Sequence, residues 1–101
     1  MTYVSTGSFD ALSLSEAPFG CRVHRHGHTS EIELEGELDL AAKPTLDDAI
    51  LTALHPGPVE TLIVDFTGVT FADSTTVTWL LRADSRARAT NGRLVAVVAP
   101  P

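Results

Sequence analysis

Two short apolar runs set the strongest limit on what this chain can fold into. Residues 61–66 (TLIVDF) and 94–98 (LVAVV) are each almost continuously apolar over the length of one strand. Such runs are typical of strands covered on both faces, as in a parallel sheet. Parallel strands need a crossover connection, which is usually a helix. The two runs therefore favour an α/β fold with a covered central sheet.

Helical periodicity fills the intervals around these runs. Before the first run, apolar residues recur at helical spacing: Leu46, Ala49, Ile50, Ala53 and Leu54. They predict a helix over roughly residues 41–54, which Asp39 is placed to cap and which His55-Pro56-Gly57-Pro58 ends. A second helix is predicted to begin near Ser74 and to end at Asn91-Gly92. Its core-facing residues are predicted to be Val77, Leu80, Leu81, Ala83 and Ala87.

The segment upstream alternates in hydropathy. Cys21, Val23, Ile32 and Leu34 are separated by polar residues, which predicts two half-buried antiparallel strands with a turn at His26-Gly27-His28. The predicted fold is α/β in the order β-β-α-β-α-β, with a mixed sheet of about four strands and helices mainly on one face. Residues 1–18 are predicted to be an N-terminal arm or edge segment, and residues 19–101 the folded domain.

Length, charge and cysteine content exclude several classes of protein. The 101 residues suffice for one domain, and a net charge of −6 lacks the basic field that holds a nucleic-acid backbone. Cys21 is the single cysteine, which excludes an internal disulfide and favours a reducing compartment. No apolar run approaches the roughly 18 residues that span a membrane, and no signal peptide is apparent. We expect a cytoplasmic protein with protein partners and with no nucleic-acid or membrane partner.

Motifs for catalysis are not apparent. The chain has no phosphate-binding glycine loop, no HExxH and no GxSxG, so we expect no enzyme activity, catalytic residue or cofactor. His24, His26 and His28 alternate as three metal ligands on one strand face would. Gly27 and the predicted turn break that geometry. We therefore expect a solvated hairpin tip and no metal site.

The segment 67–76 lies where open α/β sheets commonly place functional sites, between the carboxyl end of a central strand and a helix. Asp73 or Ser74 is first of all a cap for that helix. A functional interpretation is that Ser74 is exposed and phosphorylated, and that the added charge of about −1.5 to −2 changes what docks there. The two interpretations are compatible.

Two separated motifs resemble the STAS domain of bacterial anti-sigma factor antagonists. They are Gly36-Glu37-Leu38-Asp39 and the stretch 62–75 (LIVDFTGVTFADST), and the resemblance covers roughly residues 19–98. It implies a transcription regulator of the stress-response type that acts by partner switching. In that family, the serine or threonine after the motif aspartate is phosphorylated by an anti-sigma factor with serine kinase activity. That residue is Ser74 here, with Thr75 as the fallback.

The resemblance also implies partners and a binding surface. The unphosphorylated antagonist binds the kinase, phosphorylation breaks the complex, and a PP2C-type phosphatase restores it. The implied partner-binding residues are Asp39, Asp73, Ser74, Thr75 and Thr76.

One departure from the family leaves other functions open. The family usually has glycine where this chain has Thr76. We expect the branched side chain of Thr76 to crowd a kinase backbone. The alternative is a constitutive interaction or scaffold module without phosphorylation. A third hypothesis is a small-ligand pocket at the strand ends.

Two further expectations concern surfaces. Family members continue past the last strand with another helix, which is missing from this sequence. We therefore expect either a minimal domain, or an apolar face that is covered by the N-terminal arm or by a second subunit in a homodimer. Trp79 lies off the predicted stripe of the second helix. We favour its packing against the sheet or the first helix over a role as an interface anchor.

Overall fold

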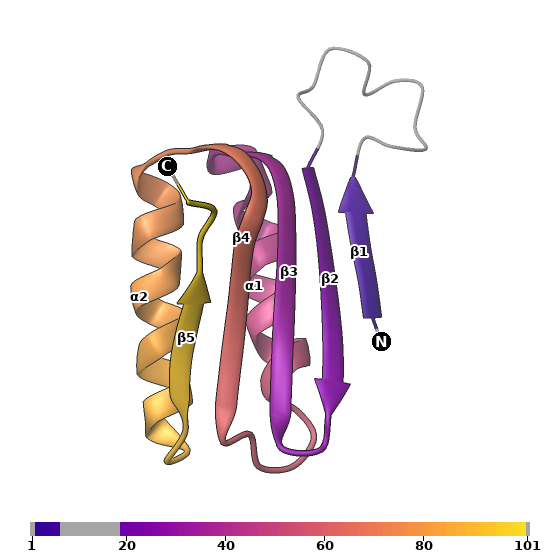
Figure 1. Cartoon of the computed structure of the whole chain (residues 1–101), viewed down its shortest axis with the longest axis vertical. Coiled ribbons are helices and arrows are strands. Elements are labelled where there is room, and N and C mark those ends of the chain that lie inside the picture. The colour runs from indigo at the N-terminus through magenta and orange to yellow at the C-terminus, as the bar shows by residue number, and fades with distance from the viewer. Residues whose placement is uncertain (1, 7–18, 101) are drawn as a thin grey trace.

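A mixed sheet of five strands forms one layer of the protein, and helices cover one of its faces (Figure 1). The structure is a computed structural model that describes residues 2–6 and 19–100. The strands lie side by side in chain order: β1 (Thr2–Thr6), β2 (Phe19–His26), β3 (Thr29–Leu38), β4 (Thr61–Ala72) and β5 (Arg93–Val97). The pairs β1–β2 and β2–β3 are antiparallel, and the pairs β3–β4 and β4–β5 are parallel.

The helical layer follows the predicted positions. A 3₁₀ turn, η2 (Leu40–Ala42), leads into α1 (Lys43–Leu54), and α2 (Ser74–Ala89) connects β4 to β5. The predicted α/β class and order of elements are confirmed. The sheet gains a fifth strand, because β1 pairs with β2 at its edge. That strand lies within the segment predicted as an arm or edge segment, and residues 7–18 of that segment lie outside the described residues.

Alternation along β2 and β3 builds the core side of the hairpin. Cys21, Val23, Ile32 and Leu34 are all buried beneath α1, whereas the residues between them face away from the helices. β2 ends at His26 and β3 begins at Thr29, so the predicted hairpin and its turn are confirmed. The positive φ of Gly27, 60°, is one that glycine adopts without strain.

The predicted apolar stripe of α2 is wrong in part. Val77 and Leu81 are 59% and 65% exposed, whereas Trp79 is only 1% exposed. The Trp79 indole packs against α1 and its Nε1 donates to the carbonyl of Leu46 at 2.8 Å. The buried face is instead formed by Thr76, Trp79, Ala83 and Ala87. The small alanines leave room for the indole between the helices, and the preferred interpretation of Trp79 is confirmed.

β4 is longer than its apolar run. The strand continues from Phe66 to Ala72, so residues 67–72 of the segment predicted to lie between the end of a strand and a helix are themselves strand. Its pairing with β3 passes two register shifts and ends with Leu38 beside Ala72. Gly68 lies close to β3 there, since a Cβ at this position would be 3.1 Å from Glu35 Cβ and 3.3 Å from the Leu34 carbonyl oxygen.

The strands β4 and β5 were expected to be covered on both faces, but the described residues cover only one face. Leu62 and Val64 of β4 are buried under the helices, whereas Val95 and Val97 of β5 are 37% and 39% exposed. Among the residues described, both long helices lie on the same face of the sheet (Figure 1). Neither long helix of the described chain is long and apolar enough to cross a membrane.

Cys21 gives a pH-dependent contribution to stability. Its side chain is fully buried, and this desolvation raises the pKa of the thiol from 9.0 to about 11. The folded state therefore holds its proton more tightly than the unfolded state, so this stabilisation is complete below pH 9 and is lost as the pH rises toward 11. We expect the free energy of unfolding to fall by about 1.4 kcal/mol more between pH 8 and pH 10 than it does in Cys21→Ala. Urea denaturation of both proteins at each pH measures this, and equal pH dependence would contradict it.

Candidate functional site

Two helix starts lie side by side where β3 and β4 end. Because Leu38 pairs with Ala72, the next residues of the two strands, Asp39 and Asp73, are brought to the same edge of the sheet. The Asp39 carboxylate accepts from the backbone N–H of Ala41 at 3.0 Å and caps η2. The Asp73 carboxylate accepts from the N–H of Thr75 at 2.9 Å and caps α2. The predicted cap of α2 is confirmed, and it is the aspartate. Asp39 caps the 3₁₀ turn that leads into α1 and not α1 itself, whose N-cap residue is Ala42.

One backbone carbonyl joins these two starts. The carbonyl oxygen of Leu38 accepts from the N–H of Asp73 at 3.2 Å and from the hydroxyl of Thr76 at 3.4 Å. Thr76 is only 4% exposed, so its side chain faces inward and does not crowd a partner that approaches from outside. The expectation that Thr76 would crowd a kinase backbone is therefore not what the geometry supports. Thr76 fastens the first turn of α2 to β3.

Removing the Thr76 side chain tests this role. We expect Thr76→Gly to lower the free energy of unfolding by about 1–2 kcal/mol, because it loses a buried hydrogen bond and methyl group and places glycine in a helix. Thr78→Gly is the matched control, since Thr78 is exposed two residues further along the same helix. Its cost is expected to stay below about 1 kcal/mol. Equal losses for the two variants, measured by urea denaturation, would show that Thr76 does not fasten α2.

Ser74 is exposed as the first residue of α2 and borders a cavity of about 260 Å³. Thr75 is half-buried, and its N–H is already bound to the Asp73 carboxylate. The serine hydroxyl is thus the more accessible of the two candidate phosphate acceptors. The cavity, called the Ser74 cavity below, is lined by Leu40, Lys43, Ser74, Thr75, Thr78, Trp79 and Arg82.

Two cations of the Ser74 cavity are held by one carboxylate. Lys43 Nζ lies 2.7 Å from one oxygen of Asp47, and an Arg82 guanidinium nitrogen lies 3.1 Å from the other. The sequence alone assigns no function to these three residues, and it favours a solvated surface for Arg82. The Lys43–Asp47 spacing of i, i+4 is a signal for an ion pair on α1, but only the packing of α1 on α2 shows that Arg82 joins it.

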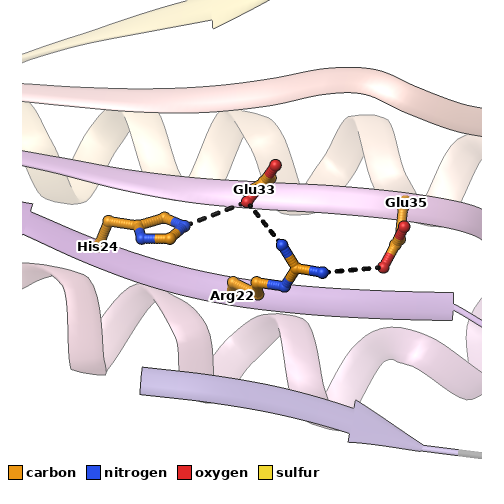
Figure 2. Close-up of polar contacts among 4 residues, drawn as sticks. All are labelled: Arg22, His24, Glu33 and Glu35. Atoms are coloured by element: carbon orange, nitrogen blue, oxygen red, sulfur yellow. Dashed lines mark hydrogen bonds and ion pairs between the residues drawn. The ribbon is translucent and has the colours of Figure 1, made fainter. Parts of the chain in front are cut away.

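A second polar cluster lies on β2 and β3, on the face of the sheet that the helices do not cover (Figure 2), and none of its residues lines the Ser74 cavity. Arg22 lies 3.5 Å from Glu33 and 3.9 Å from Glu35, and His24 Nε2 lies 3.1 Å from Glu33. The Arg22 and Glu33 side chains are about 40% exposed, and exposed pairs of this kind contribute little to stability.

The three alternating histidines do not converge. His24 contacts Glu33, whereas His28 Nδ1 lies 2.9 Å from a carboxylate oxygen of Glu60, the residue before β4. Within residues 19–100, no group of three histidine, cysteine or acidic side chains is arranged to hold a metal ion.

These observations define a class: a small α/β domain with a preformed surface around one exposed serine at a helix start. The chain belongs to the STAS domain family, since the family model described as "Mlab, STAS domain" matches residues 21–101. This confirms the resemblance of the two sequence motifs. No curated protein sequence matches the chain significantly.

Solved structures agree with this assignment. An anti-sigma factor antagonist from Mycobacterium paratuberculosis superposes with a TM-score of 0.71 at 24% identity, over 82% of this chain and 69% of that one, and supports the fold. The anti-sigma factor antagonist SpoIIAA in its unphosphorylated form gives a TM-score of 0.67 at 30% identity, over 79% of this chain and 71% of that one. The Bacillus cell fate determinant SpoIIAA in its phosphorylated form gives 0.65 at 30% identity, over 80% and 73%.

Proposed function

We propose that this protein is a cytoplasmic anti-sigma factor antagonist that acts by partner switching and is not itself an enzyme. In its unphosphorylated form it binds an anti-sigma factor with serine kinase activity, and phosphorylation of Ser74 releases it. A PP2C-type phosphatase restores the binding form. The observation that carries the proposal is the exposure of Ser74 directly after the capping Asp73, beside Asp39, in a chain that is 30% identical to SpoIIAA.

The chemistry of the switch needs only one hydroxyl on this chain. The Ser74 Oγ attacks the γ-phosphorus of ATP held by the kinase, a new P–O bond forms, and the bond to the leaving ADP breaks. The hydroxyl proton passes to a base of the kinase. The product carries a charge of about −1.5 to −2 where a neutral hydroxyl stood. An interface that closes over this position must then desolvate a dianion, which weakens the complex.

The residues around Ser74 have distinct roles in this proposal. Asp39 and Asp73 fix the two helix starts and present their exposed sides to the partner. Thr75 is the fallback acceptor, and Thr76 acts from inside by holding α2 against β3. The kinase contacts a surface that is already assembled.

Intact-mass spectrometry of the protein from its native cell tests the proposal, with fragmentation to locate any phosphate. We expect one added phosphate on Ser74, which disappears in Ser74→Ala and persists in Thr75→Val. Its absence under stress conditions with phosphatases inhibited would overturn phosphorylation as the switch. Phosphate on Thr75 alone would move the acceptor by one residue.

A second candidate function is a constitutive interaction or scaffold module. It is favoured by the description of the matching family model, which names Mlab, and not an antagonist. In this candidate the Ser74 surface binds its partner permanently, and the exposed valines of β5 form a homodimer contact. Partner affinity that does not change in Ser74→Asp supports this candidate, and a monomer in sedimentation equilibrium removes its homodimer.

A further inference from the structure

We propose that Lys43 and Arg82 form a receptor that captures the phosphate on Ser74 within the same molecule. The inference rests on the proposed function for its biological use, but the receptor is a physical property of the chain. With such a receptor, the phosphate binds cations of its own chain once the partner has left, so release of the partner is accompanied by a new contact within the protein.

The Ser74 cavity brings the three residues together. Ser74, Thr78 and Arg82 are spaced i, i+4 and i+8 along α2, so they lie on one face of the helix and all border the cavity. Long side chains on a helix point back toward its N-terminus, which directs the Arg82 guanidinium toward Ser74. Lys43, the first residue of α1, borders the same cavity from the other helix.

Both cations share one acceptor, so a stronger acceptor nearby can compete for them. Each side chain is 42% exposed, and both are held in place by the single carboxylate of Asp47. A phosphate dianion carries about twice the charge of a carboxylate and has three acceptor oxygens. It also matches the bidentate donor geometry of a guanidinium. We therefore expect the phosphate to draw Lys43 and Arg82 away from Asp47.

The charged side chains around the cavity include carboxylates that repel a phosphate and cations that attract it. Asp73 next to Ser74 and Asp39 at the neighbouring helix start repel a dianion, as does Asp47 once its cations have moved. Lys43 and Arg82 are the two cationic side chains that border the cavity. The balance predicts that the dianion is favoured only while these two cations are present.

Capture has a consequence for regulation. A bound phosphate occupies part of the Ser74 cavity and neutralises its cations, so the surface offered to the partner changes in shape as well as in charge. Holding the phosphate in the cavity also shields it from the phosphatase. We expect removal of the receptor to speed dephosphorylation.

The test places phosphoserine at position 74 by genetic code expansion in the full chain and follows its second ionisation by ³¹P NMR. We expect the pKa of the phosphate in Lys43→Gln/Arg82→Gln to be higher by about one unit than with both cations present. Arg86→Gln/Arg88→Gln is the matched control, because it removes the same charge from α2 further from Ser74. That control is expected to change the pKa by less than about 0.3 unit.

A second readout follows the receptor directly. The Nε–H signal of Arg82 is expected to shift when phosphoserine replaces Ser74, whereas the signal of Arg88, which is paired with Asp84, stays in place. Equal phosphate pKa values in the receptor and control variants, or an unchanged Arg82 signal, would overturn the receptor. If the double variant does not fold, the single variants Lys43→Gln and Arg82→Gln replace it in the test. Each is expected to raise the phosphate pKa by a smaller amount. Because phosphoserine is supplied without a kinase, these outcomes do not depend on whether the cell phosphorylates Ser74.

Discussion

Ser74→Asp is expected to lower the affinity for the proposed partner, a serine-kinase anti-sigma factor, by about 100-fold, which corresponds to about 2.7 kcal/mol. Ser74 is exposed directly after Asp73, and the helix start capped by Asp73 lies beside the one capped by Asp39. A partner that binds this surface has to desolvate the new carboxylate next to the Asp73 carboxylate. Burying a charge without a partner typically costs several kcal/mol. Isothermal titration calorimetry with the purified kinase measures the loss.

Ser74→Ala is the control for this substitution. It removes the hydroxyl without adding charge, and the Asp73 cap of α2 stays in place. We expect its affinity to stay within about threefold of the unchanged protein, since it loses at most one neutral hydrogen bond. If Ser74→Asp binds as tightly as Ser74→Ala, charge at this position does not control the complex, and the constitutive module becomes the better account.

Trp79→Ala is expected to lower the free energy of unfolding by about 3–5 kcal/mol. Trp79 is the largest fully buried side chain of the described residues, and its indole nitrogen donates to the Leu46 carbonyl at 2.8 Å. The alanines at 83 and 87 cannot fill the space between α1 and α2. Since typical domains are stable by only 5–15 kcal/mol, the loss leaves little reserve. Urea denaturation followed by circular dichroism measures it.

Trp79→Phe separates packing from hydrogen bonding. The phenyl ring keeps most of the apolar contact, but the indole donor to Leu46 is lost. We expect this variant to lose about 1–2 kcal/mol, well below the loss in the alanine variant. Similar losses in both variants would mean that the hydrogen bond, and not the packing of the ring, dominates the role of Trp79.

The sequence predicted those parts of the fold that depend on local periodicity. Alternation at Cys21, Val23, Ile32 and Leu34 identified the hairpin, and helical spacing identified α1. In α2 the prediction was correct for Ala83 and Ala87, which are buried, and wrong for Val77 and Leu81, which are exposed. Only tertiary packing shows that the buried face turns toward Trp79, which takes up the volume between the helices. Similarly, the apolar run that predicted the strand ends at Phe66, although β4 continues to Ala72 and pairs with β3 over this stretch.

The candidate site was predictable only in its local part. The capping roles of Asp39 and Asp73 follow from residue type and position. That the two residues belong to one surface followed from the family resemblance. Lys43, Asp47 and Arg82 were not predicted, because α1 and α2 are separated by the whole of β4 in the chain. Which of their side chains meet depends on how the two helices lie against each other.

The hydrogen bonds of the Leu38 carbonyl bear on how fast partners exchange. Because this one group holds both Asp73 and Thr76, the start of α2 is fixed to the end of β3 before any partner arrives. Docking on a rigid surface requires no prior ordering step, so we expect association with a partner at ordinary diffusional rates of about 10⁵–10⁷ M⁻¹s⁻¹. A covalent change at the serine then acts mainly on how long each complex lasts. The protein would sample its partners continually, and its modification would decide which encounter persists.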